Sequence, residues 1–288
     1  MSNEIEGFFR VEKESDKYVF LSLKLPSINE LPNSIFEYFF SEQVLWRHIK
    51  YRTPEIPFEP NKHNYHALYL NLLDLLDSDS ALPRGDKKGK IGELFLSVLL
   101  EQYFACRCVI PKSSLLSSKN MSVHGIDADY FMPDDNCFLF GESKVTKSLE
   151  GGIAQANLSL NDYEQSISNE YRILSKKYLE GVLPDEITAK LDVFYQEGNG
   201  EEVAAPFQRV CQVLGINTIG VAVFICHGTE TSVDGILHKL DRIKRTPVIL
   251  GMQTKYYVIS MPVGDKDSFI NGLTDLIRQK AENYGRQR

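Results

Sequence analysis

The sequence predicts an α/β protein in which helices flank a mixed central sheet. The chain has 288 residues, of which 43% are hydrophobic and 25% are charged, so it can bury a sizeable core in one large domain or two small ones. From residue 87 onward, apolar residues at helical spacing alternate with short runs of β-branched and aromatic residues. The run at residues 219–226 is uninterrupted, which is typical of a strand buried on both faces. This order of elements predicts a sheet with helices on both sides.

Residues 1–84 are predicted to form an N-terminal α+β extension, ahead of a core domain of residues 85–288. Alternation over residues 17–25 predicts a strand or hairpin, and residues 34–49 and 64–77 have the spacing of helices. The segment DSDSALPRGDKKG is polar and rich in turn-forming residues, so we expect it to connect the two parts.

A hairpin is the most regular feature of the predicted core. Residues 124–132 alternate, and the turn PDDN separates them from a second strand at residues 137–145. The other predicted elements of the core are helices at residues 87–104, 150–180, 184–214, 232–245 and 265–284 and strands at residues 107–110, 219–226 and 255–261.

Composition bears on the compartment and on the partners of the chain. No apolar stretch approaches the roughly 18 residues that a membrane-spanning helix needs, and the acidic N-terminus lacks the features of a secretory signal. We therefore expect a cytoplasmic protein without a membrane partner. The five cysteines are an odd number without a CxxC pair, which predicts reduced, mostly buried thiols. A net charge of -7 disfavours unaided binding to nucleic acid, because phosphate contacts depend on Lys and Arg.

The hairpin carries charged side chains on one face of otherwise apolar strands. Glu142 and Lys144 are two residues apart, so their side chains point the same way, and Asp127 on the neighbouring strand can lie beside them. Such a group carries a desolvation cost unless it binds something. Two carboxylates suit a hard divalent cation, and Mg²⁺, or Mn²⁺ in its place, needs only one or two of them besides water and a substrate phosphate oxygen. The lysine can then orient the attacking water and stabilise the charge that grows on phosphorus.

Two further carboxylates belong to the same hypothesis. Glu93 directly follows Gly92 in the preceding helix, and the missing side chains at Gly89 and Gly92 would let this helix lie close to the sheet, where Glu93 could complete a metal site. Asp129 occupies the same face of its strand as Asp127 by parity. From the residues alone, either aspartate could be the main ligand.

The order of these residues resembles that of a known nuclease superfamily. A glutamate in a helix is followed by Gly125-Ile126-Asp127 on one strand and Glu142-Ser143-Lys144 on the next, which match the GxD and ExK signatures of the PD-(D/E)XK nucleases. More narrowly, GKIGELFLSVLLE at residues 89–101, together with HGIDADYF and FGESKV, is similar to the HamA family, the nuclease subunit of Hachiman antiphage defence systems. The resemblance covers residues 85–261.

The resemblance implies a restriction-endonuclease-like core and a metal-dependent nuclease that hydrolyses DNA. It also implies an effector subunit of antiphage defence that works with a superfamily 2 helicase subunit (HamB-like), which restrains the nuclease until damaged or invading DNA is sensed. Carried over to this chain, the family pattern makes Asp127 and Glu142 metal ligands and Lys144 the catalytic lysine. Glu93 is then the helix acid, and Asp127 is favoured over Asp129.

Substrate contacts are expected around these residues. Some members of the superfamily place Gln and Tyr four residues apart on the helix after the ExK strand; here Gln155 is present, position 159 is Ser and the next tyrosine is Tyr163. His124 directly precedes the GID sequence, and basic residues precede the helix acid. The residues expected to contact substrate are Gln155, His124, Lys88 and Lys90.

Two alternatives remain open. A nuclease-like fold can serve only for binding, either to nucleic acid or as a regulatory subunit, but such a chain is expected to have a broken motif, whereas here every motif residue is present. The hairpin charges could also simply pair with each other, although a buried Glu and Lys pair rarely adds stability. We therefore predict a Mg²⁺-dependent deoxyribonuclease.

Overall fold

Within the described residues, eight strands form one mixed sheet. The computed structural model describes residues 9–15, 17–23, 31–46, 62–76, 84–110, 126–168, 185, 188–189, 192, 211–212, 214–228 and 232–286. The strands are β1 (Phe9–Ser15), β2 (Tyr18–Leu23), β3 (Arg107–Ile110), β4 (Ala128–Met132), β5 (Cys137–Thr146), β6 (Thr218–His227), β7 (Val248–Ile249) and β8 (Met252–Pro262). The helices are α2 (Leu31–Phe40), α4 (Lys62–Leu76), α5 (Arg84–Gln102), α6 (Leu149–Asn161), α10 (Val233–Leu240) and α11 (Lys266–Arg286).

Parallel strands occupy the middle of the sheet. The strand order is β1-β2-β8-β6-β5-β4-β3, and β7 pairs with β8 alone. The inner strands β2, β8, β6 and β5 are parallel, whereas β1, β4 and β3 run antiparallel to their neighbours. In β6 every residue from Ile219 to His227 is buried, as the uninterrupted apolar run predicts. The predicted α/β fold with a mixed central sheet is confirmed.

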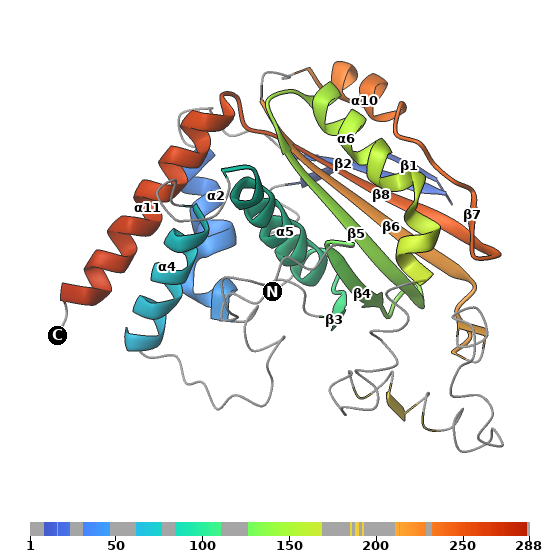
Figure 1. Cartoon of the computed structure of the whole chain (residues 1–288), viewed down its shortest axis with the longest axis horizontal. Coiled ribbons are helices and arrows are strands. Elements are labelled where there is room, and N and C mark those ends of the chain that lie inside the picture. The colour runs from blue at the N-terminus through green and yellow to red at the C-terminus, as the bar shows by residue number, and fades with distance from the viewer. Residues whose placement is uncertain are drawn as a thin grey trace.

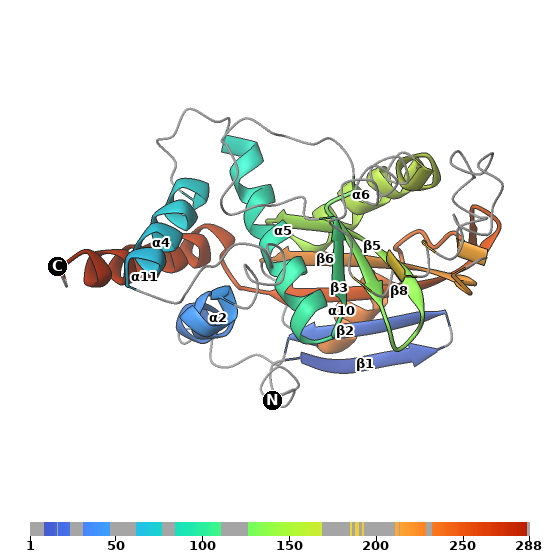
Figure 2. The ribbon, with the colours of Figure 1, turned by 90° about the horizontal axis from the view of Figure 1, so that it is seen from below.

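Helices cover both faces of this sheet. On one face α5 packs against the strands, and α2, α4 and α11 form a group beside it; the other face is covered by α6 and α10 (Figure 1, Figure 2). In β5 the side chain of Leu139 packs in the core on the α5 side of the sheet, whereas Phe138 and Phe140 pack in the core on the α6 side. This alternation arises because successive residues of a strand point to opposite faces. None of the helices in the described ranges is long and apolar enough to cross a membrane.

The N-terminal elements continue the same sheet and core. β2 pairs in parallel with β8, with Tyr18 opposite Tyr256. The rings of Phe39 and Phe95 lie 4.7 Å apart in an edge-to-face contact, which joins α2 to α5. The sequence predicts β2 but leaves open whether a hairpin partner precedes it; β1 is that partner. The domain division after residue 84 stays a prediction.

Several helix ends differ from their prediction. The helix expected over residues 34–49 is α2, which ends at Phe40, and a shorter helical segment at residues 42–46. Ser41 separates the two, and its backbone oxygen accepts the first hydrogen bond of the second segment, from Leu45. The helix expected over residues 150–180 ends at Asn161 and resumes at residues 163–168, and its remainder lies outside the described residues. Most of the helix expected over residues 184–214 also lies outside them.

Glycines let the flanking helices approach β5 closely. A Cβ atom at Gly92 would lie 2.9 Å from Val145 Cγ2 and 3.3 Å from Ser143 Oγ, so α5 packs directly on β5 at this position, as predicted. Gly89 has no atom within 4 Å of the corresponding position, and its predicted part in this approach is wrong. On the opposite face, a Cβ atom at Gly152 of α6 would clash with Ile225 Cγ2.

The cysteines of the chain are buried free thiols, as the sequence predicts. Burial raises the pKa of Cys137 and of Cys226 to about 12. Both therefore stay protonated at neutral pH, and a protonated thiol is a poor nucleophile.

The contact at Gly152 predicts a stability difference between two glycine substitutions. Gly152→Ala is expected to lower the free energy of unfolding by about 1–3 kcal/mol, because the added methyl group overlaps Ile225 and lies 3.0 Å from Thr146 Oγ1. Gly89→Ala, at an open position of α5, is expected to be neutral or to stabilise the chain by up to about 1 kcal/mol. Urea denaturation of both variants measures the difference, and equal midpoints would contradict the close packing of α6.

The turn between β4 and β5 predicts a pH-dependent contribution to stability. Asp135 accepts a hydrogen bond from the Tyr257 hydroxyl at 2.7 Å, and this bond, with the nearby Lys255 ammonium, lowers the pKa of the carboxyl despite partial burial. The contribution is present above the unfolded pKa of about 3.9 and is lost as the pH falls through the lower folded value.

Asp135→Asn is therefore expected to be less stable than the wild type at neutral pH, by at most about 1 kcal/mol because solvent screens the half-exposed carboxylate. The two proteins should converge below about pH 3. Thermal melting across the pH range measures this, and a difference that persists in acid would exclude the carboxylate as its cause.

Candidate active site

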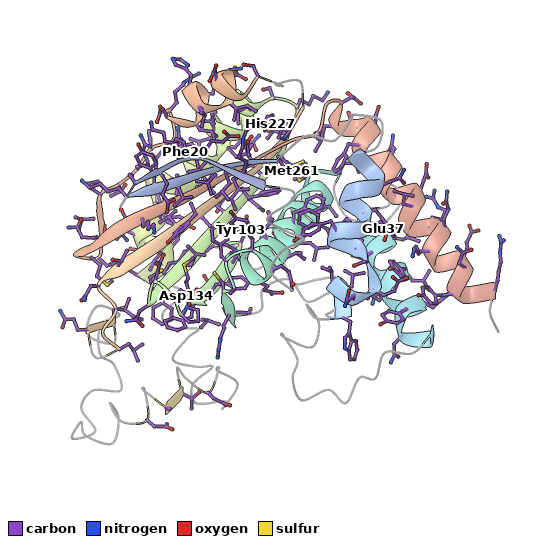
Figure 3. The ribbon with its side chains drawn as sticks, turned by 180° about the vertical axis from the view of Figure 1, so that it is seen from behind. Phe20, Glu37, Tyr103, Asp134, His227 and Met261 are labelled. Carbon is purple, nitrogen blue, oxygen red and sulfur yellow. The ribbon has the colours of Figure 1, made fainter. Side chains whose placement is uncertain are left out.

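The charged residues predicted from the hairpin lie where β5 runs past the end of β4. The ladder between the two strands ends at Ala128 opposite Gly141, whereas β5 continues to Thr146. Beyond Gly141, β5 pairs with β6 on one side, and no described strand pairs with its other edge. Thr146 lies opposite His227, which Figure 3 shows near the end of the sheet that is remote from Asp134. An open edge in a polar part of a strand offers access to a substrate.

Glu142 and Lys144 point to the same face of β5, as predicted, and they form an ion pair, which is the contact that the alternative of simple charge pairing also expects. The side chain of Glu142 is 7% exposed and that of Lys144 is 19% exposed, so the pair is largely withdrawn from water but reaches the surface at the lysine. Removing two charges from water costs free energy that their mutual attraction rarely returns in full. The pair is therefore better explained by a role in binding or catalysis than by a contribution to the stability of the fold.

Asp127 is fixed beside this pair by the backbone and side chain of Ser143. Its backbone N–H donates to Gly141 O at 2.9 Å, which continues the spacing of the ladder. Its Oδ2 accepts hydrogen bonds from Ser143 N at 2.7 Å and from Ser143 Oγ at 2.9 Å. No described residue donates a hydrogen bond to Oδ1, so this oxygen can serve a ligand. Sequence reasoning missed the role of Ser143, because its side chain points to the opposite face of β5.

The pKa of Glu142 reflects both its burial and the nearby carboxylate of Asp127. Burial raises the pKa of Glu142, and the negative charge of Asp127 raises it further, whereas Lys144 and a hydrogen bond from Ser159 oppose the shift without cancelling it. A carboxylate whose pKa is raised by burial and by a nearby negative charge is common at functional sites. A bound cation would remove the repulsion between them.

Asp129 lies deeper in the same face of the hairpin. It is 2% exposed and sits opposite Phe140, so its side chain shares the face of Glu142, as parity predicts. Asp127 is only partly buried and lies at the open edge of β5. The choice of Asp127 over Asp129 as the main ligand stays a prediction.

Two residues that the sequence analysis mentions only as departures from the Gln and Tyr pattern also belong to this face. Ser159 of α6 lowers the pKa of Glu142 by a hydrogen bond, and Tyr163 follows four residues later with 2% exposure. Burial raises the pKa of Tyr163, and the charges of Glu142, Asp129 and Asp127 raise it further. The spacing of four residues is the feature that could have revealed both, since such residues share one face of a helix.

Glu93 is the remaining residue predicted as a metal ligand. Glu93 lies on α5, next to Gly92, whose contacts are with Ser143 and Val145 on the opposite face of β5. Within the described residues, no group of three or more His, Cys, Asp or Glu side chains is placed to share a metal ion. The role of Glu93 as a third ligand therefore stays a prediction.

The structure describes only some of the four residues expected to contact substrate. Gln155 is exposed on α6, one turn before Ser159. Lys88 and Lys90 fall within the backbone of α5, but their side chains lie outside the described part of the structure, as does all of His124. Contacts of these four residues with substrate stay predictions.

The two carboxylates fit a hard divalent cation. Asp127 Oδ1 and the carboxylate of Glu142 are oxygen donors on one face of the hairpin, and Mg²⁺ is commonly bound by one or two carboxylates, with water and phosphate oxygens as its other ligands. The Ser143 hydrogen bonds hold Asp127 in one orientation, as hydrogen bonds to metal-ligating carboxylates commonly do.

Ser143→Ala tests this arrangement directly. Loss of the hydroxyl removes one of the two hydrogen bonds to Asp127, and we expect Mn²⁺ to bind about tenfold more weakly in titration calorimetry. Ser260→Ala is the matched control, because Ser260 is another buried strand serine whose hydroxyl contacts His227 Nε2 at 2.8 Å. Equal Mn²⁺ affinity in the wild type and Ser143→Ala would show that Asp127 needs no support from this hydroxyl.

Comparison with known proteins identifies the family. The family model named HamA matches residues 12–277, which is nearly the whole chain. No curated protein and no solved structure matches the chain. The match begins inside β1 and ends inside α11, so it includes strands β2 to β8, most of β1 and the candidate active site. The chain therefore belongs to the HamA family, and this membership indicates a subunit of a Hachiman antiphage defence system.

Proposed function

We propose that the chain is a Mg²⁺-dependent deoxyribonuclease that hydrolyses phosphodiester bonds and acts as the effector subunit of its defence system. The observation that carries this proposal is the Glu142–Lys144 ion pair beside Asp127 at the open edge of β5. Two carboxylates and a lysine on one hairpin supply the donors and the charge that a phosphoryl-transfer site needs. The match to the HamA family supports the defence role.

Each residue has a distinct part in this proposal. Asp127, held by Ser143, and Glu142 would bind the Mg²⁺ ion, which when bound polarises a phosphate oxygen and lowers the pKa of a water molecule. Lys144 places its ammonium group against Glu142, where it can orient the attacking water and stabilise negative charge that develops on the phosphate. Ser159 holds Glu142 from the α6 side.

The charge of the chain favours a partner for recruitment to DNA. The net charge is -7, and phosphate contacts require Lys and Arg, so we infer weak binding to DNA by the chain alone. A superfamily 2 helicase subunit would supply the contacts to DNA and restrain the nuclease until it is needed. Electrostatic complementarity between an acidic chain and a basic partner would also speed their association.

Plasmid cleavage by purified protein tests the proposed chemistry. Glu142→Gln and Lys144→Ala are each expected to slow Mg²⁺-dependent cleavage on the order of a thousandfold, which corresponds to about 4 kcal/mol of transition-state stabilisation. Glu150→Gln is the control, because Glu150 is an exposed carboxylate of α6 that pairs with Lys239 away from the site. This variant should cleave at the wild-type rate, and EDTA should stop cleavage by every protein.

The same assay separates the nuclease from the alternative of a silent binding or regulatory subunit. Cleavage is measured with and without the helicase subunit, because restraint or recruitment by the partner can change the rate. Wild-type rates in Glu142→Gln and Lys144→Ala would refute the assigned residues. If folded wild-type protein cuts no DNA in either condition, the chain is a binding or regulatory subunit.

A further inference from the structure

The hydroxyl of Tyr163 is a buried polar group whose partner is absent from the described residues. Tyr163 lies in the helical segment 163–168, directly after α6, and is 2% exposed. Its Oη forms no hydrogen bond within the described part of the chain. Burying a hydroxyl without a partner destabilises a folded protein, and native proteins rarely retain such a group without a functional reason.

Carboxylates lie around this hydroxyl. The charges of Glu142, Asp129 and Asp127 all act on it. The ring packs in the same core cluster as Ile126, which precedes Asp127, and Phe140 of β5. Ser159, four residues before Tyr163, is close enough to Glu142 to lower the pKa of its carboxyl.

The two carboxylates proposed as ligands already have other partners. Glu142 accepts a hydrogen bond from Lys144, and Asp127 Oδ2 accepts two from Ser143. Neither accepts a hydrogen bond from Tyr163. A buried, unbonded hydroxyl in the field of these carboxylates can donate to a ligand that they bind.

We propose that Tyr163 is a positioning residue of the candidate metal centre, whose hydroxyl donates a hydrogen bond to a water or phosphate oxygen bound between Asp127 and Glu142. This inference rests on the proposed metal site and adds to it a donor from the α6 side. The donor fixes the direction of the bound oxygen, because the phenol ring is locked in the core and Oη has little freedom to move. Lys144 approaches from β5, so the oxygen would be held by donors from two elements.

Tyr163→Phe keeps the ring and removes only Oη. The two possible roles of Tyr163, positioning a ligand oxygen and packing alone, predict different Mn²⁺ affinities for this variant. If the residue serves packing alone, loss of an unpaired buried hydroxyl raises the melting temperature and leaves metal affinity unchanged. If the residue positions a ligand oxygen, Mn²⁺ binding weakens about tenfold while the chain remains folded.

The experiment is calorimetric titration of the full chain with Mn²⁺, paired with thermal melting of the metal-free protein. The variants are Tyr163→Phe, Glu142→Gln and the control Tyr256→Phe. Tyr256 belongs to the same core cluster, but its hydroxyl accepts a hydrogen bond from Thr246 N at 2.9 Å. We expect Tyr256→Phe to lower the melting temperature and to bind Mn²⁺ like the wild type, and Tyr163→Phe to lose about tenfold in affinity without a lower melting temperature.

Other outcomes separate this inference from the function on which it rests. Wild-type Mn²⁺ affinity in Tyr163→Phe, with binding lost in Glu142→Gln, would overturn the role of Tyr163 and leave the metal site intact. A lower melting temperature in Tyr163→Phe would show that the hydroxyl has a structural partner and would also overturn the proposal. If the wild type binds no Mn²⁺, both the metal site and the role of Tyr163 are wrong.

Discussion

The open edge of β5 is the constraint on which the candidate site depends. Because β4 ends opposite Gly141, no strand among the described residues pairs with the backbone N–H of Ser143 on that side. A backbone donor in a buried strand needs an acceptor, and Asp127 supplies one at 2.7 Å. The requirement of the backbone thus holds a carboxylate beside Glu142, and the repulsion between the two carboxylates favours a cation between them.

Two helices confine this site from opposite faces of β5. On one face, α5 approaches so closely at Gly92 that its backbone lies next to the Ser143 hydroxyl that holds Asp127. On the other face, Gly152 lets α6 lie against Ile225, and the same helix brings Ser159 to Glu142. The polar residues are therefore held between two well-packed layers, and a shift of either helix would move a carboxylate. Such rigidity suits a site that must orient a metal and a phosphate.

The hairpin was predictable because its rules are local. Strand alternation places Glu142 and Lys144 on one face, and the PDDN turn fixes the register that brings Asp127 alongside. Contacts between residues far apart in the sequence were harder to predict. Nothing in a strand pattern indicates that Ser143, pointing to the other face, would bond to Asp127. The breaks after Phe40 and Asn161 also escaped prediction, because helical spacing continues through both of them.

The sequence by itself determined the α/β class, the hairpin, the buried central strand and the charged residues on one face, since each depends on periodicity over a few neighbours. Only the tertiary structure decided which of these residues meet. β5 and β6 are adjacent and parallel in the sheet, although 71 residues separate Thr146 from Thr218 in the sequence. This pairing fixes how α6 lies over Glu142. The places of Ser159 and Tyr163 at the carboxylates follow from this packing, which no local pattern specifies.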